Sequence, residues 1–158
     1  MSQQLFLTLE SGRNGRIEGS VTQAGFEDLI EVFSTSHEVS TDATLSGRRA
    51  RSRNQHGAFT ISKGVDKASV LLYDSWHTND RINLLKLEYY KTAHQGTLEL
   101  FYTVELENAR ITSIKQQLAN PLLSPLATIE EVSFAYMEIK WIFADPSLET
   151  ASRVDIGA

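Results

Sequence analysis

The sequence of 158 residues contains no cysteine and only three prolines. Without cysteine the chain can form neither a disulfide nor a thiolate metal site. No stretch approaches the roughly 20 apolar residues of a membrane-spanning helix, and residues 1–7 lack the basic region and long apolar core of a cleaved signal peptide. We therefore expect a cytoplasmic protein that does not insert into membranes and that is secreted, if at all, without a cleaved signal peptide.

The sequence also lacks an excess of basic residues. It carries 15 lysines and arginines against 20 aspartates and glutamates, a net charge of -5. This balance argues against a dedicated nucleic-acid-binding protein. The apolar share of 41% and the charged share of 22% are ordinary for a globular protein of one domain.

Side-chain patterns typical of an active site are missing. His37, His56, His77 and His94 are isolated in the sequence, and none has a ligand partner two or four residues away. The glycines of residues 11–20 lack the lysine and the strand-to-helix context of a phosphate loop. No serine lies in a Gly-x-Ser-x-Gly motif. We expect no catalytic residue, no metal and no cofactor, and we favour a building block or binding module over an enzyme.

Carboxylates are numerous but follow strand-like segments. Glu105 and Glu107 share one face of a strand and are interpreted as a solvated stripe. Glu130 and Glu131 are adjacent, and nothing in their spacing identifies a general acid–base pair.

One segment has the period of a helix. Five residues recur at helical spacing and share a face that must dock on an apolar surface: Ala68, Leu71, Leu72, Ser75 and Trp76. Asp66 or Ser69 can cap the start, and residues 78–80 supply the end. The pattern predicts one α-helix over about residues 66–78.

The other ordered segments have the two-residue period of strands, over residues 5–10, 26–39, 58–62, 81–91, 97–107, 109–118 and 128–143. In residues 26–39 either Ile30 and Val32 or Phe33 faces the core, and the pattern leaves both open. Residues 81–118 resemble an antiparallel meander. We predict a mainly β fold, a barrel of antiparallel strands with one flanking helix, as a single domain over residues 1–143 followed by a tail over residues 144–158.

A long polar segment interrupts this pattern at residues 40–57. It contains four arginines, Arg48, Arg49, Arg51 and Arg53, and almost no apolar residue. Such insertions in compact domains are usually functional or disordered. A solvated loop, an arm that docks on an acidic surface of another subunit, and a nucleic-acid patch are the three interpretations. The last is weakest, because no aromatic residue is interleaved for base stacking.

Three stretches resemble the haemolysin-coregulated protein (Hcp) family, the tube protein of the type VI secretion system. Residues 56–72 (HGAFTISKGVDKASVLL) resemble its strand-to-helix segment. The second stretch, residues 89–91 (YYK) followed by 101–111 (FYTVELENARI), resembles the strand pair that ends in an Asn-Ala-x-Ile turn, and residues 130–141 (EEVSFAYMEIKW) resemble its last strand. Two features depart from the family: Val70 stands where proline is frequent, and residues 40–56 are unusually basic.

The resemblance implies a β-barrel protomer that assembles as a homo-hexameric ring, with rings stacked into the inner tube of a contractile machine. It further implies export, effector delivery and virulence, with a spike protein, a contractile sheath and effectors as partners. Separately from the resemblance, we hypothesise that residues 40–57 are a loop that reaches the next subunit or ring, with Arg48, Arg49, Arg51 and Arg53 meeting carboxylates there. A tube protein of a related contractile injection particle, and a β-barrel carrier or chaperone for a small effector, are the alternatives.

Overall fold

The computed structural model describes residues 3–42, 53–118, 128–144 and 148–154. The described chain is built from strands and a single helix, in the order β1 (Gln3–Ser11), β2 (Gly15–Ile17), β3 (Ile30–Val32), β4 (Ser34–Ser36), β5 (Val39–Asp42), β6 (Arg53–His56), β7 (Phe59–Gly64), α1 (Ala68–His77), β8 (Ile82–Thr92), β9 (Leu98–Gln117), β10 (Ile129–Ala135), β11 (Glu138–Phe143) and β12 (Leu148–Arg153). The predicted mainly β fold with one helix is confirmed.

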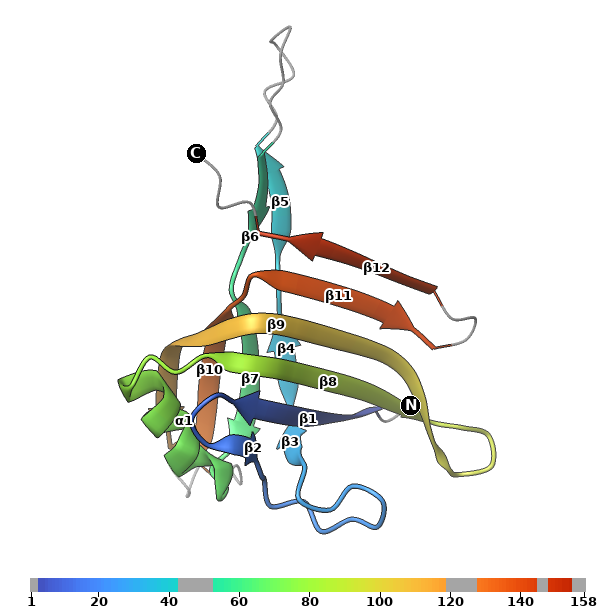
Figure 1. Ribbon diagram of the computed structural model, residues 1–158. Coiled ribbons are helices and arrows are strands. Elements are labelled where there is room, and N and C mark those ends of the chain that lie inside the picture. Colours follow the sequence, from blue (N-terminus) through green and yellow to red (C-terminus); the bar gives the residue numbers. More distant parts are fainter. Residues whose placement is uncertain (1–2, 43–52, 119–127, 145–147, 155–158) are drawn as a thin grey trace, which may run out of the picture.

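Ten strands form one antiparallel sheet that curves around the core (Figure 1). Its main path is β2-β1-β8-β9-β10-β7-β4, with β3 beside β1 and the pair β11–β12 attached to β9. The inner face carries alternate apolar side chains such as Leu85 and Leu87 of β8 and Val132 and Phe134 of β10, all of them buried.

Among the described residues, hydrogen bonds do not close the sheet into a continuous barrel, but the chain bridges its two ends. β3 pairs with β1 and β4 pairs with β7, and only Phe33 separates β3 from β4. The Phe33 N–H donates to the Ser62 carbonyl at 2.7 Å. Ile30 and Val32 face the core, whereas Phe33 is 56% exposed. Of the two orientations that the sequence pattern allowed, the structure shows the one with Ile30 and Val32 in the core.

β9 is one bent strand of 20 residues and not the two strands predicted. Its first half pairs with β8 and β11, and its second half pairs with β10. Asn108 lies near the bend with a φ of 51°, a left-handed conformation that asparagine tolerates better than most residues. The predicted meander is thus only partly correct, because the second half of β9 leaves β8 and joins another part of the sheet.

The longest predicted strand, over residues 128–143, is two strands in the structure. β10 pairs with β7 and β9, and β11 pairs with β9 and β12. The break at Tyr136 and Met137 exchanges the faces, since the even-numbered Val132 and Phe134 are buried before it and the odd-numbered Ile139 after it. Period-two alternation cannot locate such a switch, because apolar residues continue on both sides of it.

The predicted C-terminal tail contains a further strand. Residues of β12 pair along β11, from Glu138 opposite Arg153 to Phe143 opposite Leu148. This strand was not predicted, because Thr150, Ala151 and Ser152 are small residues without an apolar stripe.

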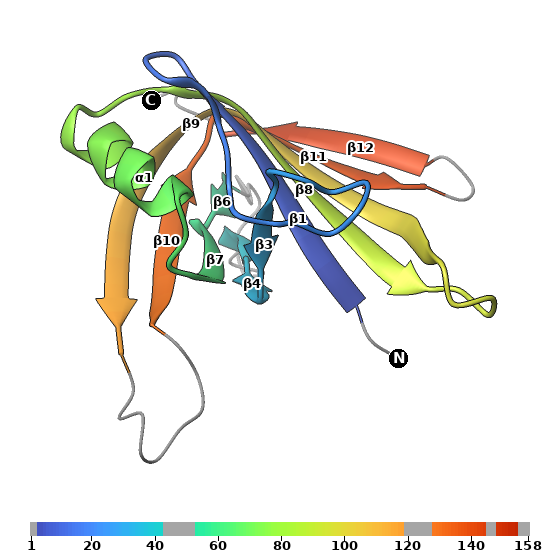
Figure 2. The ribbon, with the colours of Figure 1, turned by 90° about the horizontal axis from the view of Figure 1, so that it is seen from below.

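α1 covers one end of the sheet (Figure 2) and begins and ends close to the predicted bounds. Ala68, Leu72 and Ser75 are buried as expected. Trp76 is 50% exposed, so its assignment to the docked face is wrong, and Ser69, predicted only as a possible cap, is buried. The Asp66 carboxylate accepts the N–H of Ala68 at 3.0 Å, which satisfies one free donor of the first turn.

Candidate functional site

The segment predicted to form an arm begins and ends as a two-stranded ribbon. β5 and β6 pair antiparallel, with Val39 opposite His56, and form a sheet separate from the main one. Figure 1 shows this ribbon extending beyond β12, away from the body of the sheet. Arg48, Arg49 and Arg51 lie outside the described residues, and only the backbone of Arg53 is described, in β6.

Two histidines at the base of the ribbon converge on one hydroxyl group. The Nε2 atom of His37 lies 2.6 Å from the Tyr136 hydroxyl oxygen, and the Nδ1 atom of His56 lies 3.0 Å from the same oxygen. The Nε2 atom of His56 lies 3.1 Å from the Ser152 hydroxyl. The ribbon is thereby connected to the turn between β10 and β11 and to β12.

Burial shifts two of these groups away from their charged forms. It raises the pKa of Tyr136 to about 12. Burial, and secondarily the proximity of His56, lower the pKa of His37 below its ordinary value. At neutral pH the phenol is therefore protonated and His37 is uncharged.

His37 and His56, isolated in the sequence, lie together in the structure. They are 19 positions apart in sequence, and their common partner Tyr136 lies far from both. Only the pairing of the ribbon strands and the turn after β10 bring the three groups together. His77 and His94 are exposed on the surface, as expected for residues outside a site.

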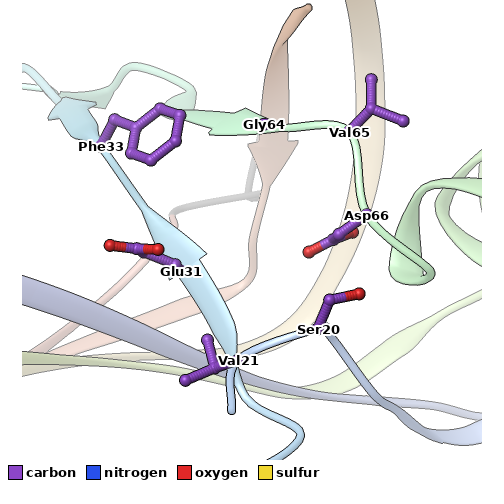
Figure 3. Close-up of a pocket in the computed structure, with 7 residues that line it drawn as sticks. All are labelled: Ser20, Val21, Glu31, Phe33, Gly64, Val65 and Asp66. Carbon is purple, nitrogen blue, oxygen red and sulfur yellow. The ribbon is translucent and has the colours of Figure 1, made fainter. Parts of the chain in front are cut away.

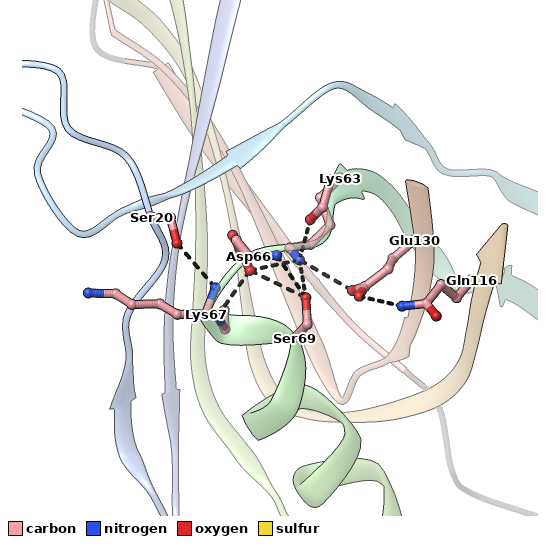
Figure 4. A network of polar contacts seen from close by, with 9 residues as sticks. Ser20, Lys63, Asp66, Lys67, Ser69, Gln116 and Glu130 are labelled. Atoms are coloured by element: carbon pink, nitrogen blue, oxygen red, sulfur yellow. Dashed lines mark hydrogen bonds and ion pairs between the residues drawn. The ribbon is translucent and has the colours of Figure 1, made fainter. Parts of the chain in front are cut away.

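A second polar group lies under the start of α1 (Figure 4). The ammonium group of Lys63 lies 3.3 Å from the Glu130 carboxylate and 3.0 Å from that of Asp66, and it donates to the Ser69 hydroxyl at 3.2 Å. The side chains of Lys63 and Glu130 have no solvent-exposed surface. Gln116 donates to the other Glu130 oxygen at 3.3 Å. The Lys63–Glu130 pair is thus buried, hydrogen-bonded and almost surrounded by protein.

This pair was missed in the sequence, although a signal for it exists. Lys63 continues the inner face of β7 after Phe59 and Ile61, and Glu130 starts the inner face of β10. The register places Glu130 directly opposite Lys63. Charges that continue two buried stripes on neighbouring strands indicate an internal ion pair.

A small cleft opens beside this group (Figure 3). It has a volume of about 170 Å³ and is lined by Ser20, Val21, Glu31, Phe33, Gly64, Val65 and Asp66. Both the Phe33 ring and the Val65 side chain are largely exposed here. The cleft combines apolar surface with two carboxylates, and it is smaller than the roughly 300 Å³ at which small-molecule pockets begin.

Large apolar side chains are exposed at several further places. On α1 they are Val70, Tyr73 and Trp76, and on the β11–β12 pair they are Phe143 and Leu148. A second shallow cleft, of about 270 Å³, lies between Tyr102 of β9 and the residues of β11 and β12. Exposed apolar surface of this kind is typical of faces that other chains cover.

Within residues 3–42, 53–118, 128–144 and 148–154, histidine and carboxylate side chains never gather in a group of three or more that could hold a metal ion. No helix in the same part of the chain is long and apolar enough to cross a membrane.

Comparison with known proteins identifies the family. Residues 6–143 match the family described as "Type VI secretion system effector, Hcp". A curated relative, the "Major exported protein" of Pseudomonas aeruginosa, is 32% identical over 126 residues, which is 78% of this chain and 73% of the relative. The fold and these matches define a component of type VI secretion. The chain belongs to the Hcp family.

Solved structures agree with this fold. A protein described as "Crystal structure of Hcp protein" aligns with a TM-score of 0.91 at 23% identity and covers 99% of this chain and 100% of its own. The "Secreted protein Hcp3 from Pseudomonas aeruginosa" aligns with a TM-score of 0.81 at 24% identity and covers 98% and 99%, respectively. At these identities the structural likeness supports the fold alone.

Proposed function

We propose that this chain is the structural protomer of hexameric rings that stack into the inner tube of a type VI secretion system. In this proposal the protomer is assembled in the cytoplasm, is exported with the tube, and can carry effectors in the lumen of the ring. Membership of the Hcp family supports the proposal, and the relative named a major exported protein is consistent with export.

The observation that supports assembly is exposed apolar surface on the protomer. Phe143 and Leu148 are exposed on the last two strands, and β12 pairs only with β11 within the described residues. Val70 and Trp76 are exposed on α1, which lies elsewhere on the sheet. A protomer that contacts neighbours on two sides of itself needs two such surfaces, as in a closed ring.

A carrier that binds its cargo within one barrel is less well supported. The core is filled by side chains such as Leu7, Leu72 and Phe134, all of them fully buried. The clefts are small and open to solvent rather than enclosed. Cargo would therefore sit between protomers, in the lumen that the ring creates.

Light scattering after size-exclusion chromatography tests the ring. We expect a particle of six times the 17.7 kDa mass of the chain at moderate protein concentration. A monomer under all concentrations and salt conditions would contradict the ring and would favour the carrier.

The ribbon is expected to be needed for stacking rather than for ring closure. We predict that deleting residues 45–54 leaves folded rings but prevents tubes in negative-stain images. The four arginines Arg48, Arg49, Arg51 and Arg53 are expected to meet carboxylates of the next ring. Individual surface ion pairs contribute only about 0 to 1 kcal/mol, so stacking should depend on their number and weaken with salt.

Two substitution sets separate charge from shape in this prediction. Replacing all four arginines by serine should prevent stacking, whereas replacing them by lysine keeps the charge and should preserve most of it at low salt. Tubes that form equally well in the serine variant would remove these arginines from the stacking contact.

A further inference from the structure

The β5–β6 ribbon leaves the sheet through a narrow base. Ser36 pairs with Thr60 in the sheet, and Val39 pairs with His56 in the ribbon. Two residues on one strand therefore oppose three on the other, an irregularity that redirects the strands. The Gly57 N–H donates to the Glu38 carbonyl at 2.8 Å. This backbone contact closes the base but does not tie the ribbon to the rest of the sheet.

Side-chain hydrogen bonds connect the ribbon to the rest of the sheet. His37 lies just before β5 and His56 ends β6, so one imidazole stands on each strand of the base. Both contact the Tyr136 hydroxyl, at 2.6 and 3.0 Å, and Ser152 of β12 contacts the far side of His56 at 3.1 Å. We call these four side chains the latch.

We propose that the latch is a pH-sensitive fastening, which holds the ribbon against the corner formed by β10, β11 and β12 at neutral pH and releases it in acid.

A count of hydrogens explains why acid would open the latch. With both imidazoles neutral, each of the three contacts has one donor and one acceptor, and the chain of hydrogen bonds can run in either direction. One added proton can still be accommodated, because Tyr136 then accepts from the charged ring and donates to the neutral one. A second proton cannot, since both rings would donate to the same oxygen and the phenol hydrogen would have no acceptor.

Electrostatics acts in the same direction. Both ring nitrogens lie within 3.0 Å of one oxygen atom, so two imidazolium charges would repel strongly at short range. The rings around His37 belong to Phe59 of β7, Tyr136 and Trp141 of β11, and they carry no negative charge.

Carboxylates that neighbour these residues along the chain give little compensation. Glu38 follows His37 in the chain and is exposed, and Glu138 of β11 lies 3.4 Å from Arg153 of β12. Among the described residues, the charged group that acts on the pKa of His37 is therefore His56, and it acts to lower that pKa.

The sign of the pH dependence follows from this lowered pKa. In the fastened state His37 binds a proton less readily than in the released state, where its pKa returns to about 6.5. Fastening is therefore fully present above about pH 6.5 and weakens as the pH falls below it. The ratio of released to fastened ribbon should rise by up to about tenfold per pH unit for each proton taken up.

If the latch opens at low pH, the ribbon of an assembled protomer no longer has a fixed orientation. That consequence rests on the proposed function, because it requires the ribbon to contact another ring. The latch itself does not, and it can be tested on unstacked protein.

Hydrogen–deuterium exchange of the ribbon amides, corrected for the intrinsic pH dependence of exchange, tests the latch at about pH 7.5 and about pH 5.0. The protein is kept dilute, with light scattering confirming that no stacks are present. We expect protection in β5 and β6 to fall by about tenfold or more at the lower pH, whereas the central amides of β8 keep theirs. Equal ribbon protection at the two pH values would overturn the proposal, and stacking has no part in that result.

Three variants identify the side chains that cause the pH response of the ribbon. His37→Gln keeps a hydrogen-bonding group that does not titrate, so most of the pH response should be lost. Tyr136→Phe removes the shared oxygen and should leave the ribbon poorly protected at both pH values. His94→Gln, at an exposed histidine outside the latch, is the matched control and should retain the full response. A response unchanged in His37→Gln would assign the acid effect to other groups and refute the latch.

Discussion

Lys63→Met is expected to destabilise the protein by about 3–5 kcal/mol, the range for breaking a buried ion pair from one side. The substitution removes the ammonium group 3.3 Å from the Glu130 carboxylate, whose side chain has no exposed surface. Gln116 would remain as a hydrogen-bond partner of Glu130, but an amide cannot balance a buried charge. Chemical denaturation at fixed protein concentration measures the loss, since assembly makes the apparent stability depend on concentration.

Two further variants show that the cost arises from the unpaired charge and not from the missing lysine. Lys67→Met removes a neighbouring lysine that pairs with Asp28 at 3.2 Å but is 52% exposed, so the expected loss of stability is far smaller than for Lys63→Met. Lys63→Met combined with Glu130→Gln removes both charges and should recover much of the stability. Similar losses in the Lys63 and Lys67 single variants would show that burial of the first pair has no energetic effect.

The Lys63–Glu130 pair also shows how far sequence patterns reach. Period-two alternation correctly predicted β1, β7 and β8, and helical spacing correctly predicted α1. Both patterns indicate which side chains share a face. A prediction based on them places a charged residue on the solvent-exposed face, because charged residues are rarely buried. A charge at the end of an apolar stripe is recognised as internal only when the opposing strand is known, and here that strand lies 67 positions further along the chain.

Two strand boundaries were predicted wrongly for a related reason. The predicted break at Asn108 is a bend in a continuous strand, and the predicted continuity through Tyr136 is a break. At both places the chain moves from one part of the sheet to another, so the apolar pattern persists while the strand partners change. Such transitions are decided by tertiary pairing, which single-strand periodicity does not contain.

The candidate site was predicted only in part. The polar composition of residues 40–57 indicated an unusual segment, and the structure shows a ribbon at both of its ends. The latch at its base was not predicted, because His37, His56 and Tyr136 have no common spacing. Their association depends on the irregular pairing at the ribbon base and on the turn after β10, and neither feature has a sequence signature here.

Gly19→Ala is expected to cost about 3 kcal/mol or more, at the upper end of the range for inserting a methyl group into a packed region. Gly19 lies where the chain returns from β2 toward β3, and its N–H donates to the Asp28 carbonyl at 2.8 Å. A Cβ atom at this position would overlap the Leu29 carbonyl oxygen and would lie 2.7 Å from the Ile30 Cα. Both are backbone atoms, so a rotamer change cannot relieve the clash.

Relief of that clash would require residues 28–30 to move, and this motion would disturb the pairing of Ile30 with Leu7 of β1. Because β3 continues into β4, the loss should extend to the segment that bridges the two ends of the sheet. Gly12→Ala is the matched control, since its nearest neighbour would be a side-chain oxygen of Asp80 at 3.4 Å, and it should change stability by less than about 0.5 kcal/mol. If the two variants unfold at the same denaturant concentration, the close approach at Gly19 does not constrain the fold.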